Sequence, residues 1–430
     1  MRQLDQSRFP RGTWLTYAAS SSDRLQALHR RVVAEIIDAA AQVRGPQSAG
    51  ILQAGGLEML HVAVDPLDVT SIRDRVLGRL RNDLLAAAVD VARSVMGWKD
   101  DFYVDDYLIL RVNMPYEVAK NADPAAENPG IGRITPSVRE LALSRKVKDP
   151  LYDPVAYHRG HPPAAWTHGP HLDSWSGHTR DGLNIWWAIS DVPAGSGMVF
   201  YPETIGKPLI CDRRTLYLQH GQQLSPPTFA PLAAGEMLIF DPEILHGTHL
   251  NVTPQTRVAI SMRLNAREPT FDPACFYARE FWRLSSDIES NEFERILHLK
   301  REDHLDRPAA LRAAPANPVR AIDVAYVAGE TVVAIGPSAL LPDGGRILAE
   351  LPDRRVLLMR SGGRPHAIES ACPHDGAELS DGGCDGRILY CPACAVGFDI
   401  ETGRSAAPSL ALKTFVSADA DGTLRVDLAE

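Results

Sequence analysis

Four of the six cysteines, Cys372, Cys384, Cys391 and Cys394, crowd into the 23 residues that end at Cys394. In a reducing compartment, such a cluster indicates metal binding before it indicates disulfides. Two short runs, Cys372-Pro-His374 and Cys391-Pro-Ala-Cys394, hold three of these four cysteines. The pattern therefore predicts a metal site near the C-terminus.

The length of 430 residues is too great for one ordinary core, so we expect two domains. Helical periodicity at 22–45 and 68–98 precedes a series of short β-type runs separated by Gly, Pro, Asn and Asp. Such runs are typical of a sandwich or jelly roll. The expected fold class is mainly β with flanking helices.

Two segments interrupt this pattern. Residues 115–165 are rich in Pro, Gly, Asn and charge, and we expect them to form a lid over a site. Residues 306–320 predict a linker, because three prolines stand among small residues. The expected domains are therefore 1–305 and 321–430.

Charge and hydropathy exclude several classes of function. A net charge of -9 argues against nucleic-acid binding, which favours a basic surface. No apolar run approaches the roughly 18–20 residues that a membrane span requires, and the first residues are polar, without the apolar core of a signal peptide. We expect a cytoplasmic protein with no membrane partner.

The first domain carries a sparse set of metal-ligating residues. His171 and Asp173 are two residues apart, so on a strand their side chains point the same way, and His246 follows the apolar run at 237–240. Two imidazoles and one carboxylate are the ligands of non-haem iron(II) oxygenases. Arg257 is suited to binding a carboxylate in two-point fashion, and Ser261 could add a hydroxyl bond if it faces the same pocket.

Together with the runs at 187–204 and 235–248, these ligands resemble a phytanoyl-CoA dioxygenase-type 2-oxoglutarate oxygenase over roughly residues 100–265. The resemblance implies a double-stranded β-helix (jelly roll, cupin-like) in which His171, Asp173 and His246 hold iron(II). It implies that Arg257 binds the distal carboxylate of the cosubstrate 2-oxoglutarate, while O2 and a small-molecule substrate complete the reaction. Because Asp173 supplies a carboxylate at the third ligand position, the resemblance favours hydroxylation, desaturation or ring chemistry over halogenation.

Other histidines compete for these roles. His249 could replace His246 as the third ligand, although the Leu-His-Gly-Thr context favours His246. His168 either lines the pocket or only forms a hydrogen bond, and His178 is expected in a loop or at the surface.

The segment 320–430 resembles a Rieske domain, a small all-β fold in which Cys-x-His and Cys-x-x-His loops bind a [2Fe-2S] cluster. This resemblance implies Cys372, His374, Cys391 and Cys394 as ligands, and Cys394 departs from it because histidine is expected there. Three outcomes stay open: a [2Fe-2S] cluster of lowered potential, a tetrahedral zinc ion with the same ligands, or a domain without metal. Cys384 does not occupy a ligand position.

The sequence predicts an iron(II)- and 2-oxoglutarate-dependent dioxygenase with an accessory Rieske-like domain, which could meet an electron-transfer partner. One alternative is a Rieske non-haem oxygenase with reversed domain order, although its helical Asp-x-x-His-x-x-x-x-His motif is missing. The other is a non-catalytic binding protein with a structural zinc module.

Overall fold

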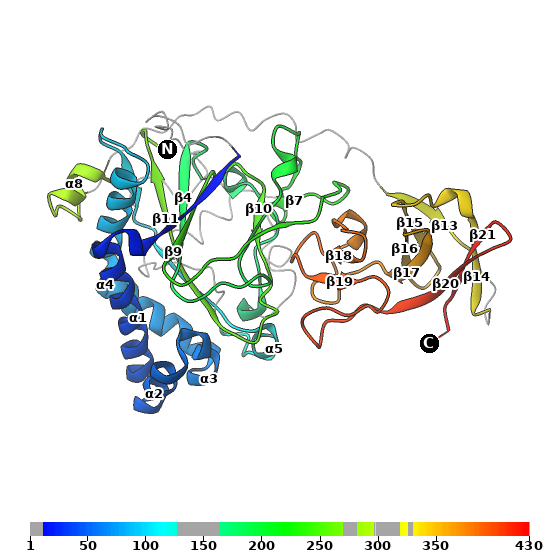
Figure 1. Ribbon diagram of the computed structural model, residues 1–430, viewed down its shortest axis with the longest axis horizontal. Coiled ribbons are helices and arrows are strands. Elements are labelled where there is room, and N and C mark those ends of the chain that lie inside the picture. Colours follow the sequence, from blue (N-terminus) through cyan, green and yellow to red (C-terminus); the bar gives the residue numbers. More distant parts are fainter. Residues whose placement is uncertain are drawn as a thin grey trace.

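The computed structural model describes residues 12–126, 163–269 except 177, 282–297 except 296, 319–325 and 330–429 (Figure 1). Most of the lid expected at 115–165 and most of the linker expected at 306–320 lie outside these ranges.

Two long helices, α1 (Asp23–Arg44) and α4 (Val69–Ser94), confirm the helical periodicity of the N-terminal part. The side chain of Ser22 caps α1 by accepting a hydrogen bond from Leu25 N. The two helices pack on each other and bury their apolar faces against the neighbouring sheet. The shorter helices are α2 (Pro46–Gly55), α3 (Leu60–Ala63), α5 (Tyr116–Ala119) and α8 (Ser285–Glu289).

The N-terminal strands form two sheets with a shared core. The larger sheet has the order β1-β9-β4-β11-β2-β12, with β3 also paired to β11, and the smaller sheet has the order β10-β5-β8. One apolar cluster joins them, with Trp186, Leu238 and Ala259 from the larger sheet and Met198 and Phe200 from the smaller. The strands of the larger sheet are β1 (Trp14–Ala18), β2 (Tyr103–Asp105), β3 (Ile109–Asn113), β4 (Gly182–Ala188), β9 (Glu236–Phe240), β11 (Arg257–Asn265) and β12 (Trp282–Leu284). Those of the smaller sheet are β5 (Met198–Phe200), β8 (Thr228–Ala230) and β10 (His246–Thr248), and β6 (Cys211–Asp212) pairs with β7 (Tyr217–Leu218).

Strand β11 has one apolar face and one polar face. Val258, Ile260, Met262 and Leu264 alternate along the face that packs on the helices. The opposite face therefore carries Arg257, Ser261 and Arg263 on a strand that is almost wholly buried. This polar inner face is the wall on which the central site is built.

The C-terminal unit is a separate all-β fold. Its seven-stranded sheet has the order β13-β15-β16-β17-β20-β21-β14, and β18 pairs with β19 in a hairpin beside it. The strands are β13 (Arg320–Asp323), β14 (Val332–Pro337), β15 (Arg346–Glu350), β16 (Arg355–Ser361), β17 (Arg364–Glu369), β18 (Ile388–Tyr390), β19 (Gly397–Asp399), β20 (Thr414–Ala420) and β21 (Thr423–Asp427). The two ligand loops (372–378 and 391–396) lie with the hairpin on the side that faces the N-terminal unit (Figure 1).

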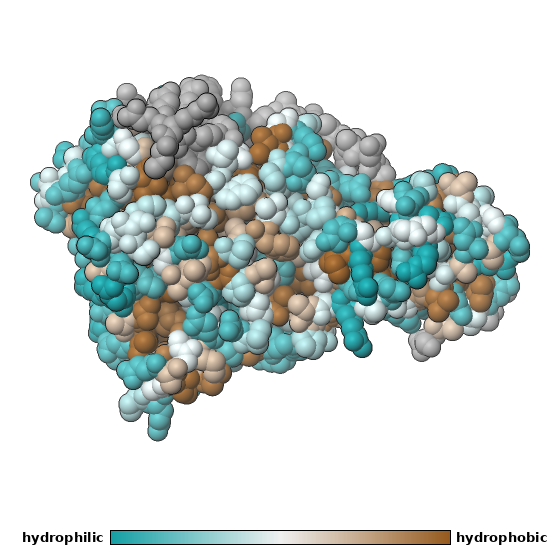
Figure 2. All heavy atoms as spheres, in the orientation of Figure 1, coloured by the Kyte–Doolittle hydropathy of each residue, from teal (hydrophilic) through white to brown (hydrophobic). Residues whose placement is uncertain are grey.

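The two units are joined by backbone hydrogen bonds near these loops. Leu250 N donates to Cys394 O at 3.1 Å, and Leu224 N donates to Asp381 O at 2.8 Å. Leu250 also belongs to the apolar cluster that surrounds the cysteines of the ligand loops. The visible face of the molecule mixes hydrophilic and hydrophobic residues (Figure 2). Within the described ranges, no helix has the length and apolar character needed to cross a membrane.

Candidate metal centres

A backbone bridge brings His171 and His246 together. His171 N donates to His246 O at 2.8 Å, and His246 N donates back to His171 O at 3.1 Å. His171 Nδ1 lies 2.7 Å from Gly169 O, and His246 Nδ1 lies 2.8 Å from Ile244 O. Hydrogen bonds at Nδ1 fix both rings and leave Nε2 as the available ligand atom on each.

The two Nε2 atoms converge on one carboxylate oxygen. Asp173 Oδ1 lies 3.4 Å from His171 Nε2 and 3.8 Å from His246 Nε2. Metal bonds of about 2.0–2.2 Å place neighbouring ligand atoms about 3 Å apart, so a small movement would let all three bind one ion. These donors fit a 2-His-1-carboxylate iron site, with the remaining coordination positions open to small ligands.

The second oxygen of Asp173 is held by side chains of the inner wall. Asn184 Nδ2 donates to Oδ2 at 2.8 Å, and Arg263 Nε lies 3.7 Å from the same atom. Burial opposes ionisation of this carboxyl, but the positive charge of Arg263 holds the pKa of Asp173 well below its ordinary value. Burial lowers the pKa of His246 to about 4, and the charge of His171 adds to this effect. The site thus offers a carboxylate and a neutral His246 imidazole at neutral pH.

The competing histidines lie elsewhere. His249 is not in this group; it lines a cavity of about 450 Å³ together with Phe229 and Tyr390. The His168 ring lies 5.4 Å from the His171 ring, between centroids. His178 lies in a loop, as one of its two expected positions, but it is buried and not at the surface.

Arg257 occupies the same inner face of β11. Its Nε donates to Ser196 O at 2.9 Å, and its guanidinium lies 5.1 Å from the centroid of the Trp186 ring. Its Nη1 is buried and has no hydrogen-bond partner among the described residues. Burial, with the charge of Arg111, lowers the pKa of Arg257 to about 9. A buried cation with an unused donor is suited to an anionic ligand.

The hydroxyl of Ser261 is engaged by a residue that sequence reasoning did not find. Arg111 on β3 donates from Nε to Ser261 Oγ at 2.8 Å. Asn184 and Arg263 were also missed, although they are cross-strand neighbours at the level of Asp173. The available signal was a polar residue within an otherwise apolar buried strand, as in Leu183-Asn184-Ile185.

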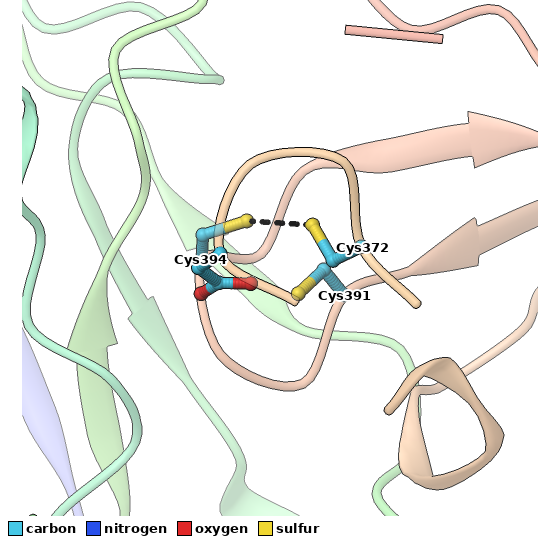
Figure 3. A group of neighbouring side chains, drawn as sticks. Cys372, Cys391 and Cys394 are labelled. Carbon is cyan, nitrogen blue, oxygen red and sulfur yellow. Dashed lines mark hydrogen bonds between the residues drawn. The ribbon is translucent and has the colours of Figure 1, made fainter. Parts of the chain in front are cut away.

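In the C-terminal unit, three of the four expected ligands converge. The side chains of Cys372, Cys391 and Cys394 point toward one another, and the Sγ atoms of Cys372 and Cys394 are 3.9 Å apart (Figure 3). All three are almost fully buried. Burial opposes ionisation of Cys391, but hydrogen bonds from the other two thiols hold its pKa well below the ordinary value. Cys384 is not part of the group, as its position in the sequence suggested.

The fourth member of this group is Asp375 and not His374. The ligand atoms of Asp375 and the three cysteines all lie within 4.8 Å of one another. The His374 ring lies beside them, with Nε2 at 3.3 Å from Ala165 O and the ring edge on Tyr116. Buried thiols grouped with a carboxylate are a donor set that fits iron or zinc.

Comparison with known families agrees with this division of the chain. Residues 63–259 match the phytanoyl-CoA dioxygenase (PhyH) family, and residues 331–415 match the Rieske [2Fe-2S] domain. The chain joins a PhyH domain to a Rieske domain. The matches support a non-haem iron oxygenase, and the Rieske match supports a [2Fe-2S] cluster.

The curated relatives that match are ferredoxin components, and each match covers 15% of this chain. The ferredoxin component of the naphthalene 1,2-dioxygenase/salicylate 5-hydroxylase systems of Ralstonia sp is 29% identical over 65 residues, which are 15% of this chain. The ferredoxin component of the naphthalene 1,2-dioxygenase system of Pseudomonas aeruginosa is 31% identical over the same length. The chain spans 62% of the length of these relatives.

Solved ferredoxins are also similar to part of this chain. The ferredoxin of carbazole 1,9a-dioxygenase from Nocardioides aromaticivorans IC177 is 22% identical, with a TM-score of 0.22, over 23% of this chain and 100% of that protein. The Sphingomonas yanoikuyae B1 ferredoxin is 26% identical, with a TM-score of 0.21, over 22% of this chain and 96% of that protein.

Proposed function

We propose that the chain is an iron(II)- and 2-oxoglutarate-dependent dioxygenase that hydroxylates a small-molecule metabolite. His171, Asp173 and His246 are the proposed iron ligands, and Arg257 is the proposed site for the distal carboxylate of 2-oxoglutarate. Bound iron(II) would supply oxygen activation coupled to decarboxylation of the oxoacid. The PhyH domain match is consistent with this reaction class.

The observation that carries the proposal is the buried, unused Nη1 of Arg257 in a domain that also holds the three converging metal ligands. The planar guanidinium is positioned by Ser196 O and Trp186, so little ordering remains when it binds a carboxylate. A site of this kind accepts a small dianion that can chelate a metal at one end and pair with arginine at the other.

Other groups around the site hold the proposed iron ligands in place. Asn184 and Arg263 hold one oxygen of Asp173, so that the other can face the metal. Gly169 O and Ile244 O fix the two rings through Nδ1. Each of these contacts fixes a ligand before the metal binds, which lowers the cost of assembling the site.

The experiment is an assay of succinate formation from 2-oxoglutarate with iron(II) and oxygen. Arg257→Ala should raise the 2-oxoglutarate concentration needed for half-maximal rate by about tenfold or more, because a buried charge-assisted pair contributes about 1.5–3 kcal/mol. Iron(II) binding should change little. Arg425→Gln, on an exposed position of β21, is the matched control. Unchanged 2-oxoglutarate dependence in Arg257→Ala would contradict the assignment.

For the C-terminal domain we propose a [2Fe-2S] cluster bound by Cys372, Cys391, Cys394 and a fourth ligand from the pair His374–Asp375. The domain limits we propose are 1–305 and 321–430, joined by a linker at 306–320. Reduced, clustered cysteines suit a reducing compartment, and we propose the cytoplasm as the location.

The face of the Rieske domain that carries the ligand loops is occupied by the PhyH domain. We therefore propose that an electron-transfer partner would meet another face of the Rieske domain, while the ligand loops stay against the oxygenase.

A further inference from the structure

One hydrogen bond joins a ligand loop of the Rieske domain to the PhyH domain. His374 Nε2 donates to Ala165 O at 3.3 Å, and both residues are buried. His374 belongs to the Cys372-Pro-His374 loop, inside the segment that matches the Rieske [2Fe-2S] domain. Imidazoles bind one of the two irons in Rieske centres, so we take His374 as the imidazole ligand from this loop. Because Ala165 O engages Nε2, Nδ1 is the ring nitrogen left for the cluster.

Two aromatic rings follow Ala165 in the chain and lead to the central site. The Trp166 ring packs edge-on against the His168 ring, at 4.2 Å between centroids. The His168 ring in turn lies 5.4 Å from the ring of His171, a proposed iron ligand. One hydrogen bond and two ring contacts therefore connect a proposed ligand of the cluster with a proposed ligand of the mononuclear iron.

Strand β10 holds this connecting segment in place. Thr248 N donates to His168 O at 3.0 Å, and Thr167 Oγ1 donates to Thr248 O at 2.6 Å. The Trp166 side chain is buried, so its position is also set by packing. An electron tunnels faster through packed and hydrogen-bonded groups than across an open gap. A segment fixed in this way keeps the contacts that such a transfer needs.

A route between the two sites serves a need that normal turnover does not meet. The proposed oxygenase draws both extra electrons from 2-oxoglutarate, so no catalytic cycle requires a relay. Iron that has been oxidised to iron(III) without product formation cannot start the next cycle, and one electron restores it. The side chains of His171, Asp173 and His246 are only 13%, 5% and 4% exposed, so a protein donor cannot touch the iron directly.

We propose that His374, Trp166 and His168 lie on an internal electron-transfer route from the Rieske cluster to the central iron site. One electron leaves the reduced cluster, which returns to its oxidised state, and iron(III) at the central site becomes iron(II). No bond forms or breaks, and no proton moves. A one-electron donor of the ferredoxin or flavoprotein class reduces the cluster. The inference rests on the proposed function in taking both metal groups as bound.

The direction of transfer follows from the cluster ligands. Cys394 stands where a Rieske centre has histidine, and its thiolate adds negative charge to the cluster. Added negative charge lowers the reduction potential of an iron–sulfur cluster. A cluster of lowered potential gives up its electron more readily, which favours reduction of iron(III) at the central site.

The test is laser-flash reduction of the anaerobic full chain, with both metal groups oxidised and deazaflavin as the photochemical electron donor. The flash should bleach the visible absorption of the oxidised cluster. The absorption should then return at a rate that does not depend on protein concentration. EPR of samples frozen before and after the flash should show loss of the iron(III) signal. These readouts follow one electron and require neither 2-oxoglutarate nor substrate.

Paired variants identify the route. Trp166→Leu should lose the concentration-independent return of cluster absorption, because it removes the ring between Ala165 and His168. Trp166→Phe keeps a ring and should retain part of the transfer. His168→Leu, at a half-buried position, should lose the same phase and replaces Trp166→Leu if that variant does not fold. Trp98→Leu is the matched control, since Trp98 is also buried but packs on Phe102 in the helical part of the chain.

Equal return rates in Trp166→Leu, His168→Leu and the unaltered protein would overturn the proposal and leave the proposed function standing. A return rate that rises with protein concentration would also overturn it, because the electron would then pass between molecules. Metal and acid-labile sulfide analysis of the same sample tests the proposed function separately. Zinc without sulfide at the C-terminal site would refute the [2Fe-2S] assignment and this route together.

Discussion

At the scale of single residues, the central site depends on neighbours that hold each ligand. The Nδ1 contacts of His171 and His246 leave one nitrogen per ring for the metal. Asp173 keeps one oxygen for the metal because Asn184 and Arg263 face the other. These contacts would hold the three proposed ligands in one arrangement.

Asn184→Ala should weaken iron(II) binding by about 10–100-fold, because it removes the hydrogen bond that orients Asp173. Equilibrium iron titration under anaerobic conditions measures this change. Asn82→Ala, on an exposed position of α4, is the matched control and should leave the affinity unchanged. Equal affinities for Asn184→Ala and the unaltered protein would show that Asp173 does not need this contact.

The sequence predicted the site residues whose type and spacing form a recognisable motif. It did not predict the residues that become neighbours of the site only through strand pairing. The spacing of His171, Asp173 and His246 and the later Arg257 was visible as a motif. Asn184 and Arg263 become neighbours only when β4 pairs with β11, which no local pattern specifies.

At the scale of elements, strand β10 and the segment before His171 approach each other closely at Gly247. A Cβ added at Gly247 would lie 3.0 Å from His168 O and 3.3 Å from Gly169 C. The strand can bring His246 to His171 only because no side chain stands between them. Helical periodicity predicted the two long helices, and the short β-type runs predicted a strand-rich fold, but neither pattern could show this contact.

Gly247→Ala should destabilise the fold by about 1–3 kcal/mol and weaken iron binding, since the added methyl group pushes the 168–170 segment away. Chemical denaturation and iron titration measure the two effects. Gly50→Ala, inside α2 with nothing within 4 Å of its added Cβ, should instead stabilise by about 0.5–1 kcal/mol. Similar behaviour of the two variants would contradict the close approach.

At the scale of the whole molecule, the Rieske domain lies with its ligand loops against the PhyH domain. Asp381 is central to this contact, because its carboxylate accepts hydrogen bonds from His220 Nδ1 and from Gly221 N. The length of the chain predicted two domains, but nothing in the sequence predicted which faces would meet.

The contact should weaken as pH rises. The hydrogen bond to Asp381 raises the pKa of His220 above its ordinary value of 6.5. A raised pKa in the folded state gives stabilisation that is complete below 6.5 and is lost as pH rises through the folded value. Hydrogen exchange of the Leu224 amide, which donates to Asp381 O, should therefore lose protection across this range after correction for intrinsic rates.

His220→Gln is the control for this pH effect, because glutamine cannot titrate. Its Leu224 protection should be independent of pH in the same range. The same pH response in both proteins would assign the effect to another group.

The most direct test of the central claim is anaerobic binding of 2-oxoglutarate to the iron(II)-loaded protein, followed by visible absorption. Chelation of iron(II) by the oxoacid should produce a new charge-transfer band that saturates with one 2-oxoglutarate per iron and disappears in His246→Ala. Iron binding without such a band, or a band that survives in His246→Ala, would contradict the proposed site.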